Sequence, residues 1–132
     1  MKNLITENVK IIYDQELKSL HVSFHGFVLY EELVKAIDYE IEMIKHYNIK
    51  TCIINLQEIG VYPIGGEEYV KKIWFPKAIE NGLKVIAFIV PTDTLGQLAM
   101  QEAHEEAEMN LLIKMKYFDN PPQAVAWTNS LL

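Results

Sequence analysis

Residues Thr51-Cys52-Ile53-Ile54-Asn55-Leu56 (TCIINL) form a short and nearly continuous apolar run. Residues 85–90 (VIAFIV) have the same character. Apolar runs of this length, without alternation, are typical of strands that are covered on both faces in a parallel sheet. Parallel strands need a long crossover connection, and the helical pattern of residues 67–80 supplies one between the two runs. The sequence therefore predicts a right-handed βαβ unit at the centre of an α/β fold.

The segments on either side of this unit extend the same architecture. In residues 17–24 apolar and polar side chains alternate, which is typical of an antiparallel strand with one solvated face. A short polar turn joins this strand to a preceding strand, so the two form a hairpin. Residues 31–47 carry apolar side chains at helical spacing, with acidic residues in the first turn and basic residues in the last. The further predicted elements are strands at residues 9–13, 17–24 and 113–118, and helices at residues 31–47, about 92–109, and from 121 onward.

The predicted fold is a single α/β domain over residues 1–132, with the order ββαβαβαβα and a mixed five-stranded sheet on which the helices pack. Pro76 lies inside the helix predicted at residues 67–80. A proline inside a helix removes one hydrogen bond and clashes with the preceding turn. This helix should therefore kink or split near Trp74 and Phe75.

The amino-acid composition indicates the cellular compartment and argues against some classes of binding partner. The chain of 132 residues is 50% hydrophobic, enough for a sizeable core, and its formal net charge is −6. This acidic balance argues against a nucleic-acid or anionic-membrane surface, because phosphates require clustered Lys and Arg. The one cysteine, Cys52, falls in an apolar run and is predicted to be buried and inert, which fits a reducing compartment. Residues 1–10 contain no apolar signal core and no segment has membrane-spanning length, so a cytoplasmic location without a transmembrane segment is expected.

Four segments, together with the element order, resemble a known family. They are LHVSFHGF (residues 20–27), CIINL (52–56), Trp74-Phe75-Pro76 and YFDNPPQAVAW (117–127). The chain resembles the SpoIIAA-like branch of the STAS-domain superfamily, a group of small α/β proteins related to the CRAL-TRIO lipid-binding fold. The resemblance spans nearly the whole chain, and it implies a SpoIIAA-like fold and a non-enzymatic interaction or small-ligand domain.

The same resemblance raises the question of a phosphorylation switch. STAS-type antagonists in sporulation signalling are switched by phosphorylation of a serine in the loop after the central strand, at the start of the following helix. The corresponding residues here, 55–66 (NLQEIGVYPIGG), contain no Ser or Thr. Serine or threonine phosphorylation of this segment is therefore not expected to regulate the protein.

The candidate metal and phosphate sites are all incomplete. The run HEEAE at residues 104–108 has no second His four residues after the first, so it lacks the zincin arrangement. His21 and His25 share the polar face of one strand, but the sequence identifies no third ligand for them. Gly65-Gly66 precedes a helix, but the two glutamates that follow would repel a phosphate. No metal or other cofactor is therefore predicted.

Three kinds of function are compatible with these patterns. The leading hypothesis is a binding or regulatory module without catalytic activity, which acts through a protein partner or a small apolar ligand. The second is a small enzyme that uses Asp93, Glu58 and His104 as acid and base groups brought together by the fold. The third is a structural subunit of a homodimer. Nucleophilic catalysis is not expected, because the sequence has no nucleophile-elbow motif and no recognisable base for Cys52.

The binding site is predicted where the parallel strands end. In open α/β sheets, ligands favour the crevice beyond the carboxyl ends of the strands, where loops diverge towards the helices. The loops at this position are predicted at residues 55–66 and 91–96, and the expected helix kink should form one wall of the crevice. The predicted ligand- or partner-binding residues are Asn55, Gln57, Tyr62, Ile64, Trp74, Thr92 and Thr94.

Overall fold

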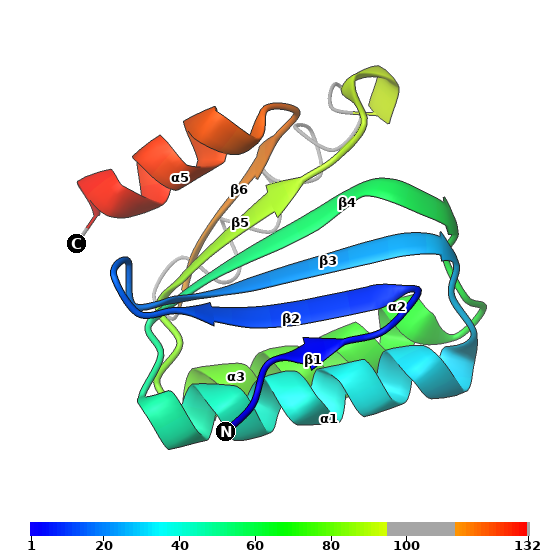
Figure 1. Ribbon diagram of the computed structural model, residues 1–132, viewed down its shortest axis with the longest axis horizontal. Coiled ribbons are helices and arrows are strands. Elements are labelled where there is room, and N and C mark those ends of the chain that lie inside the picture. The colour runs from blue at the N-terminus through cyan, green and yellow to red at the C-terminus, as the bar shows by residue number, and fades with distance from the viewer. Residues whose placement is uncertain (95–112, 132) are drawn as a thin grey trace.

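One sheet of six strands forms the centre of the computed structural model, which describes residues 1–94 and 113–131 (Figure 1). The strands are β1 (Leu4–Ile5), β2 (Val9–Asp14), β3 (Ser19–Phe27), β4 (Thr51–Val61), β5 (Val85–Ile89) and β6 (Lys114–Phe118). They follow one another across the sheet in chain order. β1, β2 and β3 pair antiparallel, whereas β3, β4, β5 and β6 pair parallel. The predicted mixed sheet is thereby confirmed.

The sheet has one strand more than the five that the sequence predicts. The additional strand is β1, which pairs antiparallel with β2 through Leu4 and Ile11. It has only 2 residues. A strand of this length contains no alternation to detect, so its sequence pattern cannot reveal it.

Helices cover both faces of the sheet (Figure 1). They are α1 (Tyr30–Tyr47), α2 (Gly66–Tyr69), the π-helical turn η1 (Val70–Trp74), α3 (Phe75–Glu80) and α5 (Pro121–Ser130). α1 and the α2–η1–α3 segment lie on one face, and α5 lies on the other. Of the helix predicted at about residues 92–109, residues 92–94 are helical and the rest lies outside the described residues. None of the helices in the described part of the chain has the length and apolarity that crossing a membrane requires.

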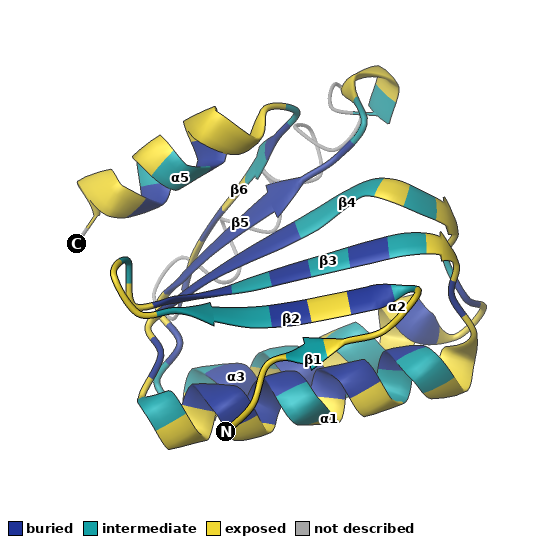
Figure 2. Cartoon of the chain, viewed as in Figure 1, coloured by how far each residue is buried: buried dark blue, intermediate teal, exposed yellow. Residues whose placement is uncertain are grey.

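Two apolar cores flank the sheet, and Figure 2 shows the buried residues along the strands and helices. Cys52 and Ile54 belong to the larger core, with α1 and α3, whereas Ile53 belongs to the smaller core, with α5. β5 is buried along its whole length. Strands covered on both faces are what the two apolar runs predict. Cys52 lies in the central strand with 0% of its surface exposed.

β4 is longer than the sequence pattern predicts. It continues to Val61, so residues 55–61 of the predicted loop belong to the strand, and the connection to α2 is short. β3 likewise continues past Gly26 and pairs with β4 across two irregularities of register. A Cβ atom at Gly60 would lie 3.4 Å from the backbone of Gly26, so glycine allows the two strands to approach closely here. Glycines and polar residues at these strand ends are typical of loops, which is why the pattern ends both strands early.

The helix predicted at residues 67–80 runs without a break through Gly66–Glu80, and it contains a π-helical turn directly before Pro76. The backbone N–H of Phe75 donates to the carbonyl of Val70, five residues back, which is the spacing of a π-helix. Pro76 follows directly as the second residue of α3 and has no N–H to donate to the preceding turn. Trp74 lies at the end of η1 with 1% of its surface exposed.

Candidate functional site

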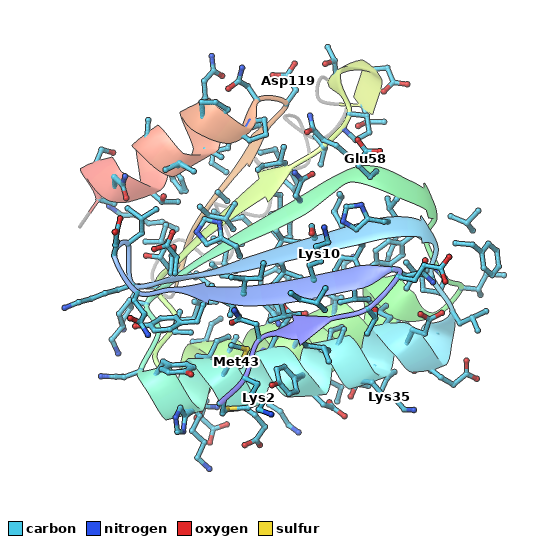
Figure 3. All side chains as sticks on the ribbon, in the orientation of Figure 1. Lys2, Lys10, Lys35, Met43, Glu58 and Asp119 are labelled. Carbon is cyan, nitrogen blue, oxygen red and sulfur yellow. The ribbon has the colours of Figure 1, made fainter. Side chains whose placement is uncertain are left out.

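The carboxyl end of β4 carries two of the predicted polar site residues. Asn55 lies in the last residue pair between β4 and β5. Its Oδ1 atom accepts a hydrogen bond of 2.9 Å from the backbone N–H of Gln57, and the Gln57 side-chain amide donates to the carbonyl of Asp119 at 2.8 Å. Glu58 on β4 and Asp119 directly after β6 are labelled in Figure 3 and mark this edge of the sheet. Gln57 therefore ties β4 to the segment that follows β6, whereas the Asn55 hydrogen bond stays within β4.

Three other predicted residues lie in the connections after β4 and β5. Thr94 Oγ1 donates to the carbonyl of Pro91 at 2.9 Å and so closes its own turn, whereas Thr92 is exposed. Ile64 lies between β4 and α2 with 99% of its surface exposed, and it borders a surface hollow together with Tyr30. A large apolar side chain this exposed is available for contact with another molecule.

The structure brings Tyr62 and Trp74 together in the wall of one cavity of about 50 Å³. Three strands contribute to this cavity near their carboxyl ends, and α1 and η1 complete it. Ile54 also lines it, and because successive side chains on a strand alternate between faces, Asn55 points to the opposite face of the sheet. The predicted residues are thus divided between this half-open, mainly apolar cavity and a polar edge. The cavity is lined by Phe24, Leu33, Ile37, Glu40, Ile54, Leu56, Tyr62, Val70, Trp74 and Phe88.

Glu40 is the carboxylic acid among the described residues that line this cavity. Its side chain projects from α1, and only 2% of the residue is exposed. Burial raises the pKa of the carboxyl group from its ordinary 4.5 to about 8, and an interaction with the Trp74 indole N–H partly opposes this rise. At neutral pH the Glu40 side chain is therefore mainly protonated and neutral. A protonated carboxyl group can both donate and accept a hydrogen bond.

Trp74 contributes a second polar atom to the cavity. Its indole Nε1 is buried and has no hydrogen-bond partner among the described residues. The indole N–H favours the charged form of Glu40, but the two groups do not reach hydrogen-bond geometry. Buried indole N–H groups usually find an acceptor in native proteins. The Trp74 N–H is therefore a donor that the described side chains leave unused.

Two further ionisable groups lie close enough to Glu40 to respond to its charge. Burial raises the pKa of the Cys52 thiol well above 9.0, and the negative charge of Glu40 adds to this rise. Burial also raises the pKa of the Tyr62 phenol to about 12, with smaller contributions from Glu67 and Glu40. Both groups are protonated at neutral pH. Neither supplies the thiolate or phenolate that nucleophilic or general-base chemistry would require.

The histidines of β3 form local pairs with serines. His21 Nε2 lies 2.8 Å from Ser19 Oγ, and His25 Nε2 lies 3.2 Å from Ser23 Oγ. Burial lowers the pKa of His21, and the carboxylate of Asp14, whose Oδ2 lies 3.9 Å from Nε2, partly opposes this shift. Within residues 1–94 and 113–131, no cluster of three or more His, Cys, Asp or Glu side chains is arranged to hold a metal ion.

Two of the three predicted acid and base groups lie within the described residues. Glu58 lies on β4 and Asp93 lies after β5, and both are exposed. His104 lies outside the described residues. An exposed carboxylate lacks the enclosed environment in which catalytic groups are usually held.

The sequence interpretation named only Tyr62 and Trp74 among the residues that line the cavity, and it missed the carboxylic acid Glu40. The signal was present, because Glu40 lies three residues after Ile37 and four before Ile44, within the apolar stripe of the helix. All three residues are buried in α1. A carboxylate in an apolar stripe is a direct sequence indication of a buried polar site.

These elements define the class of the protein: it is an α/β domain with a SpoIIAA-like fold. The chain is similar to the crystal structure of an uncharacterized protein from the DUF3478 family, with a SpoIIAA-like fold, from Shewanella loihica PV-4. The likeness covers 97% of this chain and 98% of that chain, with a TM-score of 0.62 and 16% sequence identity. No protein-family model matches the chain, and no curated protein matches it. The fold that the sequence resemblance implies is thereby confirmed.

Proposed function

We propose that this protein is a binding module without catalytic activity, and that it takes a small, mainly apolar ligand in the cavity next to Trp74. The observation that carries the proposal is the cavity itself, which lies inside the larger core at the carboxyl ends of β3, β4 and β5. Ligands of open α/β sheets favour this end of the strands. Close-packed interiors contain few voids larger than a water molecule, so a lined cavity of about 50 Å³ is a candidate site.

The chemistry of the lining supports binding over catalysis. Seven of the ten lining residues are Phe, Leu, Ile or Val, which match an apolar ligand. The ionisable groups in and beside the cavity, Glu40, Cys52 and Tyr62, are all held towards their neutral forms by burial. A SpoIIAA-like fold is compatible with a regulatory or binding role, and we therefore place the ligand-binding function in this cavity.

An NMR titration of the full chain with xenon and with 2-butanone tests the proposal. We expect shifts in the signals of Ile54, Val70 and Phe88, with saturation at a defined affinity. Val70→Phe should fill the cavity and abolish these shifts. Val125→Phe is the matched control, because Val125 is also half-buried but packs against the core on the opposite face of the sheet. Shifts confined to α5 or to the face of His21 and His25 would contradict the proposed site.

A second candidate function is the binding of a protein partner at the same end of the sheet. The observation that favours it is a set of exposed apolar side chains at the ends of β3 and β4 and in the segments that follow them. Asn55, Gln57, Thr92 and Thr94, at the carboxyl ends of β4 and β5, would add polar contacts. Native mass spectrometry of protein purified from its own host would detect a bound small molecule, a partner or a homodimer in one measurement. The exposed side chains are Phe27, Leu29, Tyr30, Val61 and Ile64.

A further inference from the structure

The cavity contains polar groups in an otherwise apolar wall. Trp74 Nε1 is buried, and no described residue accepts a hydrogen bond from it. The carboxyl group of Glu40 lines the same cavity and is buried with it. Tyr62, which is half-buried, brings a phenol to the lining. Polar recognition inside this cavity therefore depends on these few groups.

The feature that indicates a ligand is the Trp74 indole N–H, which has no hydrogen-bond acceptor among the described residues. A buried N–H without an acceptor has lost its hydrogen bonds to water and gained none in return, so the folded state is destabilised unless another molecule supplies the acceptor. The π-helical turn holds Trp74 in this position through the hydrogen bond from the Phe75 N–H to the Val70 carbonyl. π-helical turns are often found at functional sites, and this one ends at the residue with the free donor.

We infer that the cavity takes a small neutral molecule with a hydrogen-bond acceptor oxygen, such as a ketone, an ester or an alcohol, and that the Trp74 indole N–H donates to this oxygen. The inference rests on the proposed function, because it requires that the cavity takes a ligand. It adds the chemical class of the ligand and the residue that orients it. A cavity of about 50 Å³ limits the buried part of the ligand to a few heavy atoms.

The charge balance of the cavity favours a neutral ligand. A carboxylate or a phosphate would have to leave water for an apolar lining, next to a glutamate that is itself held in its neutral form. An ammonium group would face the indole N–H, which is a donor only. A neutral oxygen can accept from the indole, and the protonated carboxyl group of Glu40 offers it a second donor. Trp74 and Glu40 therefore favour a ligand that carries a hydrogen-bond acceptor, and they disfavour a ligand that carries a positive or a negative charge.

A pair of isosteric probes tests the inference on the full chain. 2-Butanone carries an acceptor oxygen, and 2-methyl-1-butene has the same heavy-atom skeleton with a methylene group in its place. The readout is the indole N–H resonance of Trp74. The other tryptophan, Trp127, packs against the smaller core on the opposite face and serves as an internal reference. We expect 2-butanone to move the Trp74 resonance downfield and to bind about tenfold more tightly than the alkene, as one buried hydrogen bond allows. The Trp127 resonance should stay in place.

Single substitutions at Trp74 and Glu40, with a control at Trp127, distinguish the effect of the Trp74 N–H donor from the effect of the shape of the cavity. Trp74→Phe removes the N–H and keeps an aromatic ring, so the preference for 2-butanone should disappear while the alkene still binds. Trp127→Phe is the matched control and should leave the preference intact. Glu40→Gln keeps a neutral side chain of similar shape with a donor and an acceptor, so it should retain binding of 2-butanone within a few-fold.

The outcomes distinguish the inference from the proposed function on which it rests. If both probes bind equally well and the Trp74 resonance does not move, the inference is overturned and the apolar cavity site stands. If neither probe binds the wild-type chain, the proposed function fails and the inference fails with it. If Glu40→Gln moves the Trp74 resonance and neither probe does, the indole serves the Glu40 side chain, and the inference is again overturned.

Discussion

The buried carboxyl group of Glu40 makes the stability of this protein depend on pH in a defined direction. The perturbation that isolates it is Glu40→Gln, which keeps the shape of the side chain and removes its titration. Burial gives Glu40 a pKa of about 8 in the folded chain, against an ordinary value of 4.5 that applies once the chain unfolds. The folded state therefore binds this proton more tightly than the unfolded state. Stability is highest when both states are protonated, and it falls as pH rises because the unfolded state ionises first.

The size of the effect follows from the two pKa values. Each unit of difference corresponds to about 1.4 kcal/mol of unfolding free energy. Wild type should therefore lose about 4 kcal/mol relative to Glu40→Gln between about pH 4 and pH 8, given a folded pKa of about 8 and an ordinary pKa of 4.5. Over this range Cys52 and Tyr62 stay protonated, since burial raises the pKa of each. His21 also titrates, but it does so in both proteins and cancels in the difference.

Urea unfolding at several pH values measures this difference directly. The two proteins should diverge steadily as pH rises, with Glu40→Gln the more stable at pH 8. Glu42→Gln is the matched control, because Glu42 lies on the same helix and is exposed. It should shift stability by only a small amount, as substitutions of exposed residues usually do. A difference between wild type and Glu40→Gln that stays constant over the range would refute the buried, neutral state of Glu40.

Two further predictions concern the surroundings of the cavity. Cys52 should react with a thiol reagent only in denaturant, since it has 0% exposure, and rapid labelling of the native chain would show that the central strand is misplaced. Gly66→Ala should lower the unfolding free energy by about 1–3 kcal/mol, as overpacking does. The added Cβ would lie 2.6 Å from Leu33 Cδ2 and 2.8 Å from Tyr62 Cε1, and both side chains line the cavity. Urea unfolding measures this loss, and a variant as stable as wild type would contradict the packing described for these residues.

The fold could be predicted from the sequence because its central strands have an unmistakable pattern. Residues 51–56 and 85–90 are apolar without alternation, and the structure covers both faces of these strands. The ends of β3 and β4 could not be predicted in the same way. Their pairing depends on a close approach of two backbones at Gly26 and Gly60, which in sequence is indistinguishable from a turn.

The site could be predicted only in part. The topological rule for α/β sheets predicted a site after the parallel strands, and Tyr62 and Trp74 line one cavity of the structure. That a ligand or partner binds there stays a prediction. The rule identifies an end of the strands but not a face of the sheet, so it grouped Asn55 with Tyr62 and Trp74, although Asn55 points to the face opposite the cavity. Glu40 was overlooked because glutamates on a helix usually face water, although its position in the apolar stripe contradicted that expectation.

Pro76 affects the position of the hydrogen-bond donor in the cavity. A proline has no N–H to donate, and its ring clashes with the carbonyl four residues earlier, which here belongs to Lys72. A regular α-helix through this region would incur that clash. The π-helical turn before Pro76 widens the backbone instead, and Phe75 donates to Val70 rather than to Lys71. This turn ends at Trp74, whose indole N–H is the free donor of the cavity. The residue that interrupts the regular α-helical pattern is therefore also the residue that sets where the unused donor lies, and so which oxygen-bearing molecule it can orient.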